Sequence, residues 1–374
     1  MKKLGRNERC WCGSGRKYKI CHLDRENQKA PVRQDYLELL KEQDEKGWCM
    51  VPPDLLKECQ GQIIRAHTIP LSSGLRGISE NHHVYRMLRG AEATIDSREP
   101  LLKPKLVGIR KASTFRGFCS KHDDELFAAI EKSEFKLNQN HIFLLVYRSL
   151  CMELFTKQRN LHSLDFQRQF DRGTTLEKQI VWQQRCDAIQ RGLELAIRDL
   201  STYKAELDSL LLGQRFEHTG YLALVFANAP QILCSGLIQP QIDLCGRPLQ
   251  NLGDKADALE YMTVVLLPYT SGSVFIVAWI GPKAAPLAFA ESLRKVNELD
   301  STNMVVRIIF SLFENTYCAP SWWDGLPDSA KTKLMERLNS HLPYRPQTID
   351  WFKEDGFAYV NWSLKERIIE EAVR

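Results

Sequence analysis

Apolar residues recur at alternating steps of three and four along residues 174–213, which is the pattern of a long helix with one apolar seam. The segment begins with threonines and ends at Gly213, residue types that commonly cap helices. Residues 138–158 predict a second helix with a broad apolar face. We expect the two helices to pack in a bundle, and a homodimer through 174–213 is the alternative. The seam consists of Cys186, Ile189, Leu193, Ala196, Leu200, Tyr203, Leu207 and Leu210.

Beyond residue 213 the pattern changes to short runs rich in β-branched and aromatic residues. Four such runs, at 221–228, 231–238, 261–269 and 274–281, predict strands, and helical periodicity returns from residue 285. Two charge-free stretches, Thr219–Ile242 and Tyr261–Pro282, are long enough to cross a membrane. Turn-type residues at 228–230 and 268–273 interrupt both. We therefore expect paired strands here and no membrane span.

The order of these elements predicts the fold class α+β, with strands first and helices after them. We expect a small N-terminal module at 1–24, a Cys/His-rich basic module at 35–133 of mixed α/β character, long helices at 134–213, and an α+β domain with an antiparallel sheet at 214–374. A chain of 374 residues, 44% hydrophobic and 26% charged, is long enough for this number of folded parts.

Eleven cysteines raise the question of disulfides. The first ten residues contain no apolar stretch that could serve as an export signal. We therefore expect reduced thiols, some of them metal ligands, and a cytoplasmic protein.

The densest group of candidate ligands is Cys10, Cys12, Cys21 and His22, with the spacing C-x-C-x8-C-H. Three thiolates and one imidazole make a complete tetrahedral set for zinc, the type found in structural sites. The intervening GSGRKYK provides glycines for a tight turn and cations that offset the thiolate charge. The sequence therefore predicts a zinc site at residues 10–22.

RNERCWCGSGRKYKICH at residues 6–22 resembles the SEC-C motif, with Trp11 where a proline is common. The resemblance covers a small part of the chain and implies zinc as the cofactor. It also implies a docking role toward proteins or ribosomes, which is the role of related motifs in the many different chains that contain them. Catalysis, if present, is expected elsewhere in the chain.

A second group is formed by Cys59, His67, Cys119 and His122. Cys59 and His67 flank a strand-like run, and Cys119 and His122 form a C-x2-H pair at the start of a predicted helix. Together they could hold a second zinc ion. The alternative is that they are independent buried residues.

Basic residues are concentrated beside both groups. Residues 100–122 contain no acidic residue, and residues 1–22 contain a single one. Such segments suit contacts with the phosphates of nucleic acid, and a solvated basic face is the alternative. The candidate phosphate contacts are Lys103, Lys105, Arg110, Lys111, Arg116 and Lys121.

The same region bears a loose likeness to HNH-type nucleases. The likeness implies His67 as general base, Asn81 as the residue that orients it, and His122 as a ligand at the start of a helix. Two features depart from the pattern: "AH" stands where "HH" is usual, and the segment from Asn81 to Cys119 is long. His67 cannot be both a zinc ligand and the base, so the two hypotheses exclude each other.

We therefore expect a cytoplasmic bacterial zinc-binding protein with a SEC-C adaptor that recognises nucleic acid or a ribonucleoprotein, with stress or phage defence as one possible setting. Two alternatives stay open. One is an HNH-like metal-dependent nuclease, so the sequence leaves open whether the protein is an enzyme. The other is a protein-docking factor that makes no contact with nucleic acid.

Overall fold

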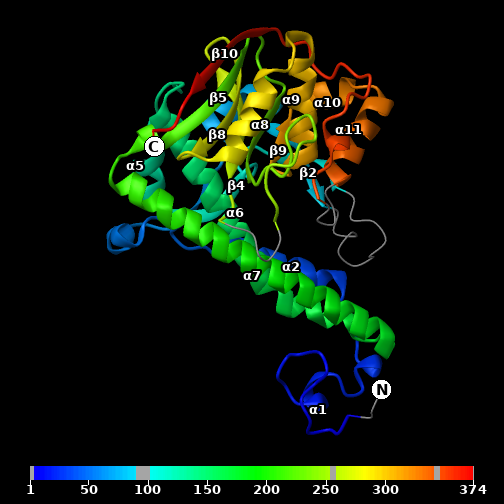
Figure 1. Cartoon of the computed structure of the whole chain (residues 1–374). Helices are drawn as coiled ribbons and strands as arrows, with labels where there is room; N and C mark the ends of the chain where they lie inside the picture. The colour runs from blue at the N-terminus through cyan, green and yellow to red at the C-terminus, as the bar shows by residue number, and fades with distance from the viewer. Residues whose placement is uncertain (1–3, 90–101, 253–257, 341–345, 374) are drawn as a thin grey trace. The chain divides into compact units, whose positions relative to one another are not determined.

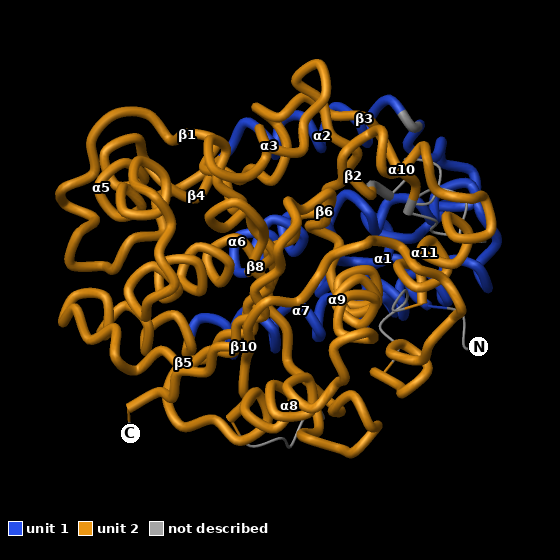
Figure 2. Tube along the Cα trace, turned by 90° about the horizontal axis from the view of Figure 1, so that it is seen from above, with its two compact units in different colours: residues 1–46, 154–201 blue, residues 47–153, 202–374 orange. Residues whose placement is uncertain are grey.

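The computed structural model describes residues 4–89, 102–252, 258–340 and 346–373. The chain divides into two compact units, which Figure 2 colours separately. Unit 1 contains residues 1–46 and 154–201, and unit 2 contains residues 47–153 and 202–374. The two long helices α6 (Gln139–Gln167) and α7 (Leu176–Leu212) each contribute residues to both units.

Unit 1 is helical in its described residues. Besides its parts of α6 and α7, it contains α1 (Tyr18–Cys21), α2 (Arg33–Glu45) and the short 3-10 helices η1 (Arg25–Asn27) and η4 (Arg168–Asp171).

Unit 2 combines two sheets with helices. Its first part contains η2 (Pro53–Glu58), β1 (Ile63–His67), η3 (Leu71–Leu75), α3 (Arg76–Ile78), β2 (His83–Arg89), β3 (Leu102–Gly108), β4 (Thr114–Cys119) and α5 (Ser120–Glu131). Its second part contains η5 (Phe216–His218), β5 (Thr219–Phe226), β6 (Ile232–Ile238), β7 (Met262–Tyr269), β8 (Gly272–Ile280), α8 (Ala284–Arg294), α9 (Glu298–Leu312), β9 (Thr316–Cys318), α10 (Pro320–Gly325), α11 (Asp328–Ser340), η6 (Ile349–Trp351) and β10 (Leu364–Glu370).

The larger sheet has eight strands in the order β10-β5-β8-β7-β6-β9-β2-β3. Every neighbouring pair in it is antiparallel. The four strands expected from the apolar runs are β5 to β8 at its centre. The smaller sheet pairs β1 with β4.

Both faces of the central strands are covered. Alternate residues of β5, β7 and β8 join one apolar core together with residues of α8, α9 and α11, and Figure 1 shows α8 and α9 lying across this face. On the other face, the hydroxyl of Ser149 in α6 lies 2.8 Å from that of Ser235 in β6. All residues of β5 and β8 are buried as a result. This double burial explains the charge-free stretches, since strands covered on both faces have no polar side.

The α+β fold class is confirmed. None of the described helices combines the length and the apolar character needed to cross a bilayer.

The seam of the long helix faces protein. Cys186, Leu193, Leu200, Tyr203, Leu207 and Leu210 are buried. The helix ends at Leu212, and Gln214 rather than Gly213 takes the left-handed backbone, with φ of 52°. Burial of the seam within one chain favours the bundle, and the homodimer stays a prediction.

The compact units do not coincide with the four segments expected from the sequence. Residues 1–46 belong with 154–201, and strands β2 and β3, from the segment 35–133, extend the sheet formed by residues 219–370. The physical reason is that an antiparallel sheet can recruit strands far apart in sequence, which local composition does not reveal.

Candidate metal centres

The first centre is built by a narrow loop that turns back on itself. The Cys10 amide donates to the Arg16 carbonyl at 2.8 Å, and the Tyr18 amide donates to the Glu8 carbonyl at 2.8 Å. Gly13 closes the loop with φ of 75°, a conformation that suits glycine. The loop brings Cys10 and Cys12 beside Cys21, the last residue of α1, and His22, which follows it.

The donor atoms of the first centre converge. His22 Nδ1 lies 3.2 Å from both Cys10 Sγ and Cys21 Sγ, and the Sγ atoms of Cys12 and Cys21 are 3.5 Å apart. Ligand atoms bound at 2.0–2.3 Å to one tetrahedral ion lie roughly 3.5 Å apart. Cys10, Cys12 and His22 are also buried, and Cys21 is half-buried. The four side chains therefore fit one metal ion.

The close approach of Cys12 and Cys21 shifts the pKa values of the two thiols in opposite directions. The hydrogen bond from Cys21 lowers the pKa of Cys12 to about 2, and the same contact raises the pKa of Cys21 well above its ordinary value. A second thiolate beside Cys12 is therefore unfavourable, and a divalent cation would offset the repulsion between the two charges. The electrostatics of the loop therefore favour a bound cation.

The second centre lies at the junction of the smaller sheet with α5. Cys119 ends β4, and His122 lies in the first turn of α5. Residues 48–50 run along β4, because the Trp48 amide donates to the Arg116 carbonyl (3.2 Å) and the Met50 amide to the Gly117 carbonyl (2.8 Å). This pairing places Cys49 next to Cys119, whose amide lies 3.4 Å from Cys49 Sγ.

The fourth member of the second centre is Cys59, which follows η2. His122 Nδ1 lies 3.5 Å from the Sγ atoms of Cys49 and Cys59 and 3.3 Å from that of Cys119. All four donor atoms lie within 4.8 Å of one another. The spacing again suits a tetrahedral ion with three thiolates and one imidazole. The second centre therefore has the same donor types as the first.

His67, expected as a ligand and as a catalytic base, is not part of the second centre. In the antiparallel pairing of β1 with β4, Ile63 lies opposite Cys119 and His67 lies opposite Thr114. Four residue steps along the strand correspond to roughly 13 Å, so His67 lies at the opposite end of the smaller sheet from Cys119. Its Nε2 lies 3.2 Å from the Ile109 carbonyl oxygen, and burial lowers its pKa. The expected set is corrected to Cys49, Cys59, Cys119 and His122.

Cys49 is not part of the set expected from the sequence, because it precedes the segment that contains Cys59 and His67. A usable signal was its position ten residues before Cys59, with Pro52 and Pro53 between them. Zinc ligands often come in pairs close together in the sequence, and Cys49 is the cysteine nearest to Cys59 along the chain.

Asn81, the residue expected to orient a base, lies in the turn before β2. It is exposed and has a left-handed backbone, with φ of 49°. Its carbonyl oxygen lies 2.7 Å from His83 Nδ1. No hydrogen bond joins Asn81 to His67 among the residues that the structure describes.

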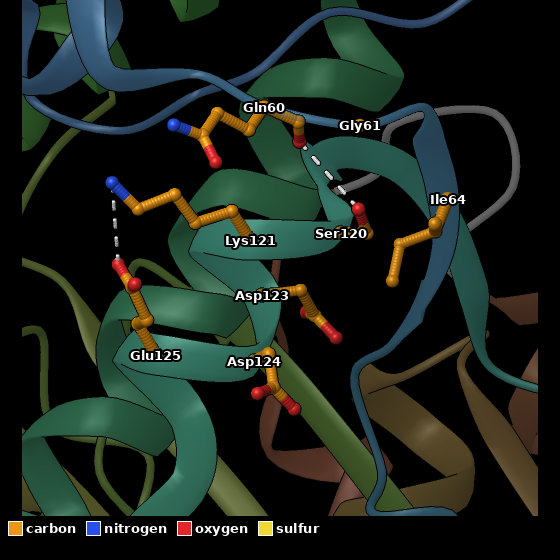
Figure 3. Close-up of a pocket in the computed structure, with 8 residues that line it drawn as sticks. All are labelled: Gln60, Gly61, Ile64, Ser120, Lys121, Asp123, Asp124 and Glu125. Carbon is orange, nitrogen blue, oxygen red and sulfur yellow. Dashed lines mark hydrogen bonds and ion pairs between the residues drawn. The ribbon is translucent and has the colours of Figure 1, made fainter.

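A pocket adjoins the start of α5. It is lined by Gln60, Gly61, Ile64, Ser120, Lys121, Asp123, Asp124 and Glu125. Figure 3 shows the Lys121 side chain extending toward Glu125, while the carboxylates of Asp123 and Asp124 point away from it. Lys121 Nζ lies 3.4 Å from Glu58 and 3.9 Å from Glu125. The three carboxylates make this pocket unsuitable for a phosphate.

The six candidate phosphate contacts fall into two classes. Arg116 and Lys121 are engaged in the fold, Arg116 through a 3.1 Å bond to the Ile63 carbonyl and Lys121 through its acidic neighbours. The other four are exposed and have no ion pair or hydrogen bond from their side chains to the described part of the chain. These four are Lys103 and Lys105 of β3, and Arg110 and Lys111 in the turn that follows.

Comparison with known proteins identifies one segment of the chain. No curated protein and no solved structure matches the chain. Among protein families, residues 6–24 match the SEC-C motif, which includes all four residues of the first centre. The N-terminal segment of this chain is a SEC-C motif.

Proposed function

We propose that this is a zinc-binding protein that holds one zinc ion at each centre and binds nucleic acid or a ribonucleoprotein through exposed basic side chains. Zinc is supported by the donor sets, because three thiolates and an imidazole at tetrahedral spacing suit zinc better than the harder divalent cations. Each centre has four protein ligands and leaves no position for a water or a substrate. Such closed sites are structural.

The observation that carries the nucleic-acid proposal is a pair of like charges in the larger sheet. Lys105 of β3 lies directly opposite Arg86 of β2. Directly opposed residues of antiparallel strands project from the same face, and like charges there are destabilising. Arg86 packs against the Tyr317 ring, 6.0 Å from its centroid, and its Nε is buried with no hydrogen-bond partner among the residues that the structure describes. An anion beside this pair would remove the repulsion.

The surroundings of the pair extend the basic surface. Lys103 projects from the same face as Lys105, two residues before it, and Arg110 and Lys111 follow the end of β3. We call Lys103, Lys105, Arg110 and Lys111 the β3 basic surface. Four exposed cations close together in sequence suit a phosphate backbone, because each can displace a condensed counterion.

The SEC-C motif presents a second basic surface, within unit 1. Arg6, Arg9, Arg16, Lys17 and Lys19 are exposed and form no ion pair with the described residues. Ile20, in the same segment, is 67% exposed. The cations fit a ribonucleoprotein partner, whereas the exposed Ile20 fits the docking of a protein.

A salt titration tests the nucleic-acid proposal. Binding of a fluorescent duplex of DNA or RNA is measured by anisotropy between low and moderate salt. If the four residues of the β3 basic surface each contact a phosphate of DNA, the logarithm of affinity falls with that of salt with a slope of about −3.6. Lys103→Ala with Arg110→Ala should reduce the magnitude of the slope by about 2 and weaken binding to duplexes of any sequence to the same extent.

The matched control is Lys333→Ala with Lys353→Ala, which removes two surface cations that pair with Glu336 and Asp350. This variant should bind as the wild type does. A well-folded protein with no affinity for DNA or RNA at low salt would overturn the proposal and leave protein docking through the SEC-C motif as the remaining function.

The HNH-like nuclease is not part of the proposal. The ring of His67 is bonded to the Ile109 carbonyl, and the residues lining the pocket beside α5 do not include His67 or Asn81.

A further inference from the structure

We propose that Asp171 fixes His22 in the tautomer that binds metal, and thereby makes the first centre hold its ion more tightly than the second. The inference rests on the proposal that zinc occupies both centres. Nothing in the SEC-C motif itself supplies this contact, because Asp171 lies 149 residues after His22. Both residues belong to unit 1.

The geometry assigns the two nitrogens of the His22 ring. Nδ1 faces the Sγ atoms of Cys10 and Cys21, each 3.2 Å away, and Nε2 lies 3.0 Å from Asp171 Oδ2. A carboxylate accepts hydrogen bonds, so the proton of the neutral ring resides on Nε2. The lone pair of Nδ1 is then free for the metal. The Trp11 ring packs against the imidazole, with centroids 4.5 Å apart, and limits its rotation.

Asp171 is itself held in place by neighbours within unit 1. Its side chain is fully buried, and it accepts hydrogen bonds from Arg25 Nε and from Gln183 Nε2, the latter at 2.7 Å. The Arg25 guanidinium also donates to the carbonyls of Cys21 (3.1 Å) and Arg168 (2.8 Å). The carboxylate therefore has a compensating charge and a fixed orientation. A buried carboxylate whose hydrogen bonds are satisfied can orient a metal-binding histidine and hold it in place.

The second centre lacks this support. His122 Nδ1 also faces three sulfurs, but its buried Nε2 has no hydrogen-bond partner among the described residues. Cys59 is exposed and Cys49 is half-buried, whereas three of the four ligands in the first centre are buried. Solvent and chelators reach the second centre more easily. The second centre should therefore release its ion first.

Zinc release to an excess of a chromogenic chelator tests the inference. We expect two phases, which the single-site variants Cys12→Ser and Cys119→Ser assign to the first and second centres. Asp171→Asn keeps the size of the side chain and removes its charge. It should speed the slow, first-centre phase by about 10–100-fold, the range for lost outer contacts of metal ligands, and leave the fast phase unchanged.

Two further variants test whether Asp171→Asn speeds zinc release through His22 or by destabilising unit 1 as a whole. Asp187→Asn removes another carboxylate of unit 1, which pairs with Arg168 at 2.7 Å, and should leave both phases unchanged. His22→Cys replaces the imidazole by a thiolate that needs no tautomer. In that background Asp171→Asn should not speed release further.

The outcomes distinguish the inference from the proposed function. If Asp171→Asn leaves the slow phase unchanged, or speeds release equally in the His22→Cys background, the inference about Asp171 is overturned while zinc binding stands. If the purified protein contains no zinc and takes up none, the proposed function fails with it.

Discussion

Cys49 Sγ lies 3.5 Å from His122 Nδ1, although the two residues are 73 positions apart in the sequence. The contact arises because residues 48–50 run along β4 and α5 begins directly after that strand. It completes a second set of three cysteines and one histidine.

The first prediction concerns this contact. Cys49→Ser should lower the zinc content by one ion per chain, because a hydroxyl is a much poorer zinc ligand than a thiolate. Loss of a ligand should also destabilise the part of unit 2 around the smaller sheet, since metal binding and folding are coupled. Elemental analysis gives the zinc content, and thermal unfolding gives the stability.

The controls for Cys49 use another cysteine and the expected histidine. Cys245→Ser changes an exposed cysteine outside both centres and should keep the full zinc content. His67→Ala should keep it as well, because His67 bonds to the Ile109 carbonyl and not to the centre. A loss of one zinc ion in His67→Ala, with no loss in Cys49→Ser, would restore the set expected from the sequence.

The second prediction concerns the like charges of Lys105 and Arg86. Lys105→Glu converts their contact into an attraction across the two strands. It should raise the free energy of unfolding by about 0.5–1 kcal/mol and weaken nucleic-acid binding. Denaturant unfolding and anisotropy measure the two effects on the same protein. A variant that is more stable than the wild type but binds nucleic acid more weakly would show that Lys105 serves binding rather than folding.

Lys103→Glu is the matched control for this trade-off. Lys103 lies opposite Leu88 on β2 and therefore has no cation directly across the strand. The substitution should weaken binding to a similar extent without the gain in stability. An equal gain in the free energy of unfolding in both variants would show that repulsion between Arg86 and Lys105 is not what destabilises the wild type.

The third prediction is a pH dependence in the core beside α11. Although burial acts to raise it, hydrogen bonds from Tyr359 and Arg337 hold the pKa of Asp355 below its ordinary value of 3.8. The Arg337 Nη2 to Asp355 Oδ2 distance is 2.7 Å, and both side chains are almost fully buried. A carboxyl whose pKa is lowered by folding stabilises the fold above pH 3.8, and this stability is lost as the pH falls through the lowered value.

Asp355→Asn tests this dependence. At neutral pH it should cost about 3 kcal/mol, because it leaves Arg337 buried without its charge partner. The difference in unfolding free energy from the wild type should shrink below pH 3.8. A difference that stays constant as the pH is lowered would exclude Asp355 as the titrating group.

How much the sequence reveals depends on how local each feature is. The four ligands of the first centre fall within 13 residues, so their spacing alone predicts the set, and the four central strands are apolar runs bounded by turn residues. Which residues form the second centre depends on how β1 and residues 48–50 are aligned along β4. Pairing of Ile63, rather than His67, with Cys119 decides that His67 is excluded. Local composition contains no information on that register.

The edge strands of the larger sheet illustrate the same limit. The edge strands β3 and β10, and β2 next to β3, contain charged residues, with Pro104 in β3, so they lack the apolar pattern of the central strands. Asp171 is a further example, because its role depends on a contact with His22 that no sequence spacing suggests.

The zinc content of the native protein tests the central claim most directly. Native mass spectrometry of the full chain, purified without chelator, should show two zinc ions per chain, with one lost in Cys12→Ser and one lost in Cys119→Ser. Both variants should keep the ion of the other centre, since the two sets share no ligand. A wild-type protein that holds a single zinc ion, or an ion that survives both substitutions together, would contradict the account.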